Sequence, residues 1–168
     1  MSGRLRALVG LFAMAISSFA VAGGVTVDNA WVRLPVPGQS VAGVYMTLQS
    51  PVDAALVGVS SPVAGQAEVH QMGLDSAGIM HMQAVASLAL PAGRPVRLAP
   101  GGYHIMLQQL RQPLHAGEKV PLELRIETAD HQIEQVSVVA DVLGFNNQPV
   151  GMGHPGMPGG VGGVSNLH

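Results

Sequence analysis

The apolar residues of this chain come in short runs, and nearly every run is ended by glycine, proline, aspartate or serine. Between Val25 and Val142 no stretch sustains the 3.6-residue periodicity of an amphipathic helix. The 22 glycines and 12 prolines, more than a fifth of the 168 residues, are typical of short strands joined by turns. The sequence therefore predicts an all-β domain and excludes a coiled coil or a helical bundle rich in Glu, Lys and Leu.

Nine runs are candidate strands, and nine strands in about 120 residues are typical of a two-sheet sandwich or a small barrel. Val120, Leu122, Leu124 and Ile126 occupy alternate positions of one run, so they are expected to line the core. Trp31, the only tryptophan, is expected in the core or near its edge. The candidate strands are Val25–Arg33, Val41–Leu48, Ala55–Ser60, Gln66–Met72, Gly78–Val85, Arg94–Leu98, Tyr103–Leu110, Val120–Glu127 and Ile133–Val142.

The first 22 residues have the pattern of a secretory signal peptide. Arg4 and Arg6 precede an apolar run from Ala7 to Ala20, and Ala20-Val21-Ala22 supplies the small residues that a signal peptidase recognises. The run is shorter than the roughly 20 residues that a membrane-spanning helix needs, and no second hydrophobic segment follows. We therefore expect an exported, periplasmic protein with no membrane span in the mature chain.

Charge and cysteine content exclude several classes of function. The chain carries ten acidic and eight basic residues, and removal of Arg4 and Arg6 with the leader changes the net charge from −2 to −4. Nucleic acid is not an expected partner, because contacts to phosphates need clustered Lys and Arg. The chain has no cysteine, which excludes disulfides, thiolate nucleophiles, blue-copper thiolates and zinc–thiolate sites.

Composition changes abruptly after Leu143. Residues 144–168 contain eight glycines and three prolines and no run that could bury much surface, so we expect a flexible tail after a folded domain over 23–143. An inert linker is one interpretation of this tail. The other is a mobile metal-binding segment, whose candidate ligands are Met152, His154, Met157 and His168.

Methionine and histidine crowd into the middle of the chain. Within 37 residues lie four of the seven methionines that follow the leader and three of the seven histidines. Thioether sulfur is a soft donor that suits Cu(I), and imidazole also binds copper, whereas Mg²⁺ and Ca²⁺ prefer carboxylates and carbonyls. The mixture therefore points to copper. Its members are His70, Met72, Met80, His81, Met82, His104 and Met106.

Spacing supports one shared site. Residues i and i+2 of a strand project from the same face with Cα atoms about 6.6 Å apart, so two long side chains can converge on one ion. Three such pairs occur here: His70 with Met72, Met80 with Met82, and His104 with Met106.

The last pair carries the most information. Tyr103, Ile105 and Leu107 form an apolar alternate set that should face the core, so His104 and Met106 are expected on the outward face. A methionine placed only for packing would more naturally point inward with Ile105.

Each of these residues also has an ordinary structural interpretation. Methionine fills gaps in cores, and a single histidine is usually a surface or hydrogen-bonded residue. His115 and His131 lie outside the cluster and are expected to be solvated surface residues. The grouping of the others, with two His-x-Met units flanking a Met-His-Met run, favours a metal site over coincidence.

The cluster resembles the signature of the periplasmic copper chaperones called PCu(A)C. In that signature a histidine and one further residue, often methionine, are followed by ten residues, a methionine, twenty-one residues and His-x-Met. Here His70-Gln71, Met82 and His104-Ile105-Met106 have both intervals, with Gln71 where many members carry methionine. The resemblance extends to Ala30-Trp31-Val32-Arg33, Pro37-Gly38-Gln39, Tyr45-Met46, Pro100-Gly101-Gly102-Tyr103 and Pro113-Leu114.

The resemblance implies a cupredoxin-like, Greek-key β-sandwich that binds Cu(I) at an exposed edge through His70, Met82, His104 and Met106. It implies a carrier rather than an enzyme, with a copper-accepting subunit of a respiratory oxidase or another copper chaperone as partner. We expect the carrier to be a monomer. A tail rich in Met and His is similar to that of some members, where it supplies a looser copper site. For this tail the hypothesis is Cu(II) binding through its imidazoles. Further candidate ligands in the domain are Met72, Met80 and His81.

Two alternatives stay open at this point. One is a scavenging or resistance protein that buffers periplasmic copper without a dedicated acceptor. The other is an immunoglobulin-like adhesion or assembly module with no metal role. Hydrolysis has little support, because Asp75, His81 and Ser87 are near one another in sequence but nothing marks them as a catalytic triad.

Overall fold

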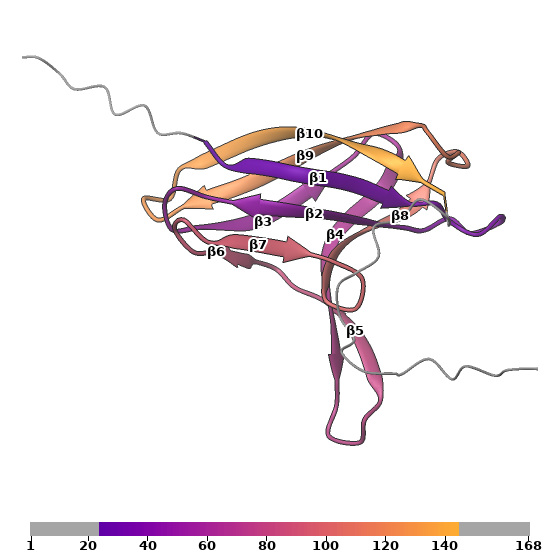
Figure 1. The fold of residues 1–168 in the computed structure, drawn as a ribbon, viewed down its shortest axis with the longest axis horizontal. Coiled ribbons are helices and arrows are strands. Elements are labelled where there is room, and N and C mark those ends of the chain that lie inside the picture. Colours follow the sequence, from indigo (N-terminus) through magenta and orange to yellow (C-terminus); the bar gives the residue numbers. More distant parts are fainter. Residues whose placement is uncertain (1–23, 145–168) are drawn as a thin grey trace, which may run out of the picture.

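Ten β-strands make up the fold in the computed structural model, which describes residues 24–144. The expected signal peptide and the candidate tail ligands Met152, His154, Met157 and His168 lie outside the described residues. The strands are β1 (Thr26–Arg33), β2 (Ala42–Gln49), β3 (Ala54–Ser60), β4 (Ala64–Leu74), β5 (Met80–Ala84), β6 (Leu88–Leu90), β7 (Pro95–Leu98), β8 (Tyr103–Leu110), β9 (Lys119–Thr128) and β10 (Ile133–Leu143) (Figure 1).

The sequence pattern located nine of these strands and missed β6. Three residues, Leu88–Leu90, are too few to show an alternation of period two, yet Leu88 and Leu90 are buried and β6 pairs with β3. Strand β4 is longer than expected and continues to Leu74, because it pairs with β5 out to Leu74 and Met80.

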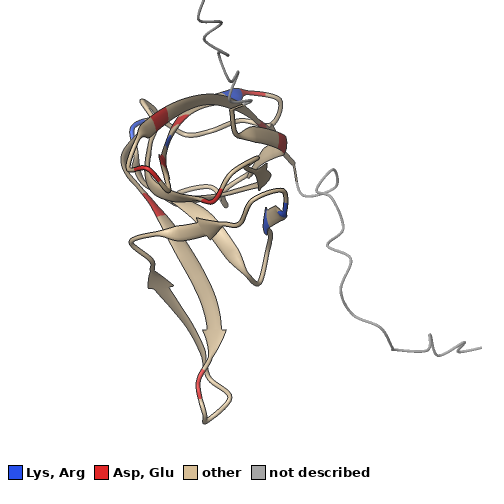
Figure 2. Cartoon of the chain, turned by 90° about the vertical axis from the view of Figure 1, so that its left-hand side faces the viewer, with Lys and Arg blue, Asp and Glu red and all other residues tan. Residues whose placement is uncertain are grey.

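Hydrogen bonding joins the strands into one curled sheet. The order is β5-β4-β8-β2-β1-β10-β9-β3-β6, with β7 added on β2. The parallel pairing of β1 with β10 links its two halves, which are otherwise antiparallel. Figure 2 shows the sheet curled around its core, with one hairpin extending away from it. The architecture is the expected all-β, cupredoxin-like sandwich.

Alternation along the strands separates the core from the outer faces. Val120, Leu122, Leu124 and Ile126 of β9 are all buried, as their spacing predicted. Ile105 of β8 is also fully buried in the core, so its neighbours on either side in sequence must project from the opposite face of that strand. The core therefore sets the direction of the side chains that form the site described below.

The β4–β5 hairpin extends beyond the body of the domain (Figure 1). Its outer part exposes four large apolar side chains, those of Leu74, Ile79, Met80 and Met82. The turn at its tip is held by Asp75, whose carboxylate accepts hydrogen bonds from the backbone N–H groups of Ala77 and Ile79.

No helix within residues 24–144 is long and apolar enough to cross a membrane.

Candidate metal centre

Strand pairing places two histidines opposite each other. His70 of β4 lies directly across from His104 of β8 in the antiparallel register, and their ring centroids are 5.9 Å apart. Directly opposed residues of an antiparallel pair have Cβ atoms about 4.5–5.5 Å apart, so both side chains start from one small area of the sheet face. These two residues come from positions 34 apart in the chain, and only the fold brings them together.

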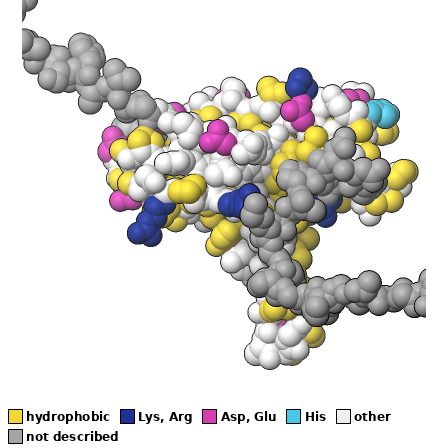
Figure 3. Space-filling model, viewed as in Figure 1, with side chains coloured by type: hydrophobic (Ala, Val, Ile, Leu, Met, Phe, Trp, Pro, Cys, Tyr) yellow, Lys and Arg dark blue, Asp and Glu magenta, His cyan; other side chains and the backbone are white. Residues whose placement is uncertain are grey.

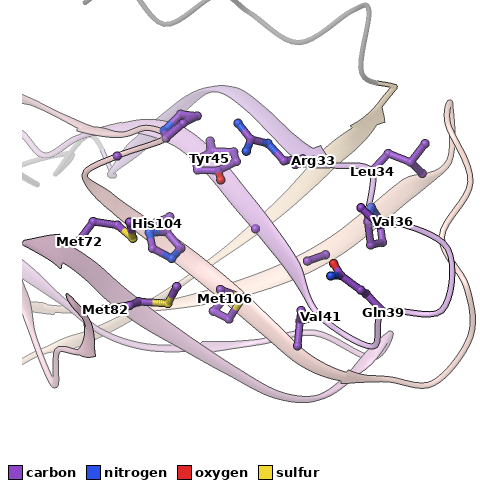
Figure 4. Close-up of a pocket in the computed structure, with 15 residues that line it drawn as sticks. Arg33, Leu34, Val36, Gln39, Val41, Tyr45, Met72, Met82, His104 and Met106 are labelled. Carbon is purple, nitrogen blue, oxygen red and sulfur yellow. The ribbon is translucent and has the colours of Figure 1, made fainter. Parts of the chain in front are cut away.

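Three thioethers surround the same area. Met72 is two residues beyond His70 on β4 and lies opposite Met82 of β5, while Met106 is two residues beyond His104 on β8. All these positions share the parity that places them on one face of the β5-β4-β8 sheet. Met72, Met82, His104 and Met106 line one hollow of about 420 Å³, and Figure 4 shows their side chains gathered on one side of it.

The hydrogen bond of His70 determines which of its nitrogens is free. Nε2 lies 3.2 Å from Oε2 of Glu68, and since a carboxylate can only accept, Nε2 carries the proton and donates it. Nδ1 is left with a lone pair. Among the buried side-chain nitrogen and oxygen atoms of residues 24–144, this Nδ1 is the one without a hydrogen-bond partner. A buried polar atom without a partner is costly, and a bound cation would remove that cost.

His104 is oriented in the opposite sense. Its Nδ1 lies 3.1 Å from the carbonyl oxygen of Gly102, so Nδ1 donates and Nε2 keeps the free lone pair. The turn before β8 positions that carbonyl: Gly101 has a φ of +85°, in the left-handed region that favours glycine, and Gly102 N–H donates to the carbonyl of Ala99 at 3.0 Å. Backbone geometry therefore selects the ring nitrogen that is available to a ligand.

His104 lies on the strand face that the sequence predicted, but it is not exposed there. His104 and Met106 do project from the face opposite Ile105, but His104 is only 4% exposed. The reason is that neighbouring strands cover it, with His70 on one side and Tyr45 of β2 on the other, 6.2 Å away between ring centroids. Burial penalises the charged imidazolium and lowers the pKa of His104 below 6.5.

Four rings form a row across four adjacent strands. Trp31 of β1 packs against Tyr45 of β2 with ring centroids 4.5 Å apart, and the row continues through His104 to His70. Trp31 is buried as expected, yet it lies in this row rather than in the central apolar cluster. The guanidinium of Arg33 stacks over Tyr45 at 5.6 Å from its centroid. Tyr45 and His104 of this row line the hollow.

Two further candidates from the sequence do not reach the hollow. Met80 pairs with Leu74 nearer the tip of the hairpin, and its side chain is exposed. His81 projects to the other face of the hairpin, where it bonds to Asp75 (2.8 Å) and lines a separate cavity with Gln71. Gln71 therefore faces away from His70, and Met72 is the residue of this segment that supplies a sulfur on the side of the hollow.

The residues that support the two histidines were not predicted from the sequence. Glu68 receives hydrogen bonds from His70, Gln66 (2.8 Å) and Gln108 (3.2 Å), and these bonds, that from His70 foremost, lower the pKa of its carboxyl. Glu68 is two residues before His70, so its position on the same strand face was a usable signal. The role of the Gly102 carbonyl had no such signal, because backbone acceptors do not appear in a sequence pattern.

The chemistry of the donors is soft and uncharged. Within residues 24–144, no three His, Cys, Asp or Glu side chains come together in a way that could hold a metal ion. The hollow instead offers three thioether sulfurs and one imidazole, with the free nitrogen of a second imidazole beside it. Such a set is suited to Cu(I) rather than to hard divalent ions.

Solved structures share this architecture. A structure described as the copper-bound PCuAC domain from PmoF2 aligns with a TM-score of 0.59 at 23% identity, over 73% of this chain and 95% of that one. The solution structure of CuI-DR1885 from Deinococcus radiodurans aligns with a TM-score of 0.56 at 32% identity, over 77% of this chain and 85% of that one. The fold is therefore that of a PCuAC domain.

The family assignment is more specific than the resemblance seen in the motif. The model of the family described as "Putative lipoprotein LpqE-like" matches residues 25–138, and this chain belongs to that family. A protein of Leifsonia xyli subsp. xyli (strain CTCB07), named "Putative lipoprotein Lxx21020", is 34% identical over 126 residues, which are 74% of this chain and 75% of that protein. The likeness to PCu(A)C proteins is therefore a likeness of fold, and the family of this chain is the LpqE-like one.

Two histidines should titrate in opposite directions from the ordinary value of 6.5 in the copper-free protein. Burial lowers the pKa of His104, whereas a hydrogen bond from His131 to Glu127 raises that of His131. Just below pH 6.5 the unfolded chain binds a proton at residue 104 that the folded protein does not, so the His104 contribution makes the free energy of unfolding fall as the pH falls through this window. Imidazole NMR signals recorded against pH give both midpoints. A midpoint for His104 at or above 6.5 would contradict the described burial.

Proposed function

We propose that this protein is an exported carrier that binds one Cu(I) ion through His70, Met82, His104 and Met106. The observation that carries the proposal is that three thioethers and the His104 imidazole line one hollow, with the His70 imidazole directly opposite His104. One nitrogen of each imidazole is left free because the other nitrogen is hydrogen-bonded. Met72 shares the wall of the hollow, and we assign it as an alternative or additional sulfur ligand.

The supporting hydrogen bonds match those of known metal-bound histidines. A ligating histidine usually donates its other ring N–H to a carboxylate or a carbonyl, which fixes the ring and raises its basicity. His70 has the carboxylate of Glu68 and His104 has the carbonyl of Gly102. Glu68 also brings a negative charge close to a site whose four ligands are neutral, so it offsets the charge of a monovalent ion.

Two structurally similar proteins also support a copper site in this chain. One is described as copper-bound and the other as the Cu(I) form of DR1885, at 23% and 32% identity to this chain. Those descriptions belong to those proteins. Their shared fold makes Cu(I) the first metal to test here.

Release of the ion would proceed by ligand exchange from the exposed side inward. Met82 lies on the projecting hairpin and is 49% exposed, whereas His104 is buried and His70 is nearly so. An acceptor's ligand would first replace the thioether of Met82 and then the remaining donors one at a time. Thioethers bind more weakly than thiolates and cannot form disulfides, which suits a carrier outside the cytoplasm. We propose a copper-accepting oxidase subunit or a second copper chaperone as the acceptor.

We place the carrier in the periplasm because of the signal-peptide pattern over residues 1–22. The LpqE-like family and the Leifsonia relative are both described as lipoproteins. The 168 residues here include no cysteine, so a lipid linked through cysteine sulfur has no attachment residue among them.

The residues after the domain would add a second, weaker copper site. Met152, His154, Met157 and His168 provide two thioethers and two imidazoles within 17 residues. The imidazoles among them suit Cu(II) as well as Cu(I).

Removal of a proposed ligand should weaken Cu(I) binding strongly. Loss of a supporting residue of a metal site costs about 10-fold to 100-fold in affinity, so Glu68→Gln should fall in that range and His104→Ala or Met106→Ala should cost at least as much. Competition titration against a Cu(I) chelator under reducing conditions measures the affinities. His131→Ala is the matched control, because this histidine is exposed and bonded to Glu127, outside the hollow. Wild-type affinity in both ligand variants would remove His104 and Met106 from the proposal.

The tail site predicts a second equivalent of copper. A variant with Met152 and Met157 changed to Leu and with His154 and His168 changed to Gln should lose that equivalent, most clearly for Cu(II), and keep the Cu(I) affinity of the first site. Metal analysis after dialysis and the visible Cu(II) spectrum give the stoichiometry. Unchanged stoichiometry for both oxidation states would exclude a contribution from the tail.

A further inference from the structure

A second, mostly apolar groove lies next to the metal hollow. Its volume is about 360 Å³, and it is formed by the loop between β1 and β2 (residues 34–39) and the loop between β8 and β9 (residues 113–116). The aliphatic walls are Leu34 and Val36 on one side and Leu114 and Ala116 on the other. Figure 3 shows hydrophobic side chains at the end of the body where these loops meet. The metal site described above does not use this groove.

The last described residues of the chain lie between the two walls. The carbonyl of Leu143 accepts a hydrogen bond from the N–H of Leu34 at 3.1 Å, which ties the end of β10 to the first wall. A Cβ placed on Gly144 would lie 3.8 Å from the Cβ of Ala116, which belongs to the second wall. The chain therefore leaves the domain beside the groove, next to one residue of each wall.

The next residue is a strong candidate to fill it. Phe145 follows Gly144 directly, and it is the only phenylalanine after the expected leader, the other two being Phe12 and Phe19. Its Cα is about 3.8 Å from that of Gly144, so its ring starts within reach of both walls. Pro149 and Val150 follow after three polar residues. A segment tethered this closely has a very high effective concentration at the groove.

We propose that residues 145–150 fold back onto the domain and that Phe145 seats its ring in the groove between Leu34 and Leu114. The groove then acts as an intramolecular docking site for the start of the tail. Docking of this kind covers apolar side chains that the domain leaves partly open, among them Val36, and it requires no metal.

Docking would also direct the rest of the tail toward the metal hollow. The loop of residues 34–39 is a shared wall, because Leu34, Val36 and Gln39 line both the groove and the hollow. A chain that leaves the groove at Val150 is two residues from Met152 and four from His154. This consequence rests on the proposed copper function, whereas the docking itself does not.

The test uses NMR on the full, copper-free protein with carbon-labelled methyl groups and labelled aromatic rings. Nuclear Overhauser effects are expected between the ring protons of Phe145 and the methyl groups of Leu34 and Leu114. Phe145→Ser should abolish them and shift the methyl signals of both leucines. Leu167→Ser is the matched control, an apolar-to-serine change after the domain but outside residues 145–150, and it should leave the signals in place. Unchanged methyl signals of Leu124 and Ile126 in the core report that each variant is folded.

Two results would overturn the proposal. One is the absence of these contacts together with methyl signals of Leu34 and Leu114 that do not change in Phe145→Ser. The other is contacts that appear only between labelled and unlabelled molecules in a mixed sample, since the occupant would then be the segment of a second copy. Because the sample contains no copper, a failure of docking does not affect the proposal that the domain binds Cu(I). A protein that docks its tail but binds no Cu(I) would instead refute the proposed function alone.

Discussion

The pairing register of β4 with β8 is the constraint on which the site depends. It sets His70 opposite His104, and the continuation of β4 into β5 sets Met72 opposite Met82. A slip of one residue would turn every side chain of the slipped strand to the other face. The buried Ile105 and Val69, which pair with each other on the core side, hold the register because either would be exposed by such a slip. The core therefore specifies the site on the opposite face.

The side chains of the site differ in exposure: the two histidines are enclosed, and the methionines are more accessible. On the inner side His104 is buried beside Tyr45 and His70 is largely enclosed, and hydrogen bonds to the Gly102 carbonyl and to Glu68 hold the two rings. On the outer side the thioethers of Met82 and Met106 are less enclosed, and Met82 stands on a hairpin that projects from the body. Glu68 supplies a negative charge that the four proposed ligands, all neutral, lack. Enclosed histidines would hold a soft ion in place, and more exposed methionines would let an acceptor reach it. A protein that binds and then releases such an ion needs both.

Much of this arrangement could be predicted from residue types and spacing, and part could not. Alternation located nine strands, and the i, i+2 pairs placed His104 and Met106 on one face, because both are local properties of a strand. The short strand β6 escaped, as did the burial of His104, which depends on Tyr45 and His70 from other strands. His81 was grouped with its neighbours in sequence, although period-two geometry turns it to the other side of the hairpin toward Asp75.

The ring nitrogens of His70 and His104 test directly whether these two histidines bind Cu(I). In protein labelled with ¹⁵N at histidine and titrated with Cu(I) under reducing conditions, the account predicts that the largest imidazole shifts occur at Nδ1 of His70 and Nε2 of His104, with one equivalent of copper. His115 and His131, which bond to glutamates at the surface, should keep their signals at that equivalent. Shifts confined to histidines other than His70 and His104, or saturation without change at these two nitrogens, would contradict it.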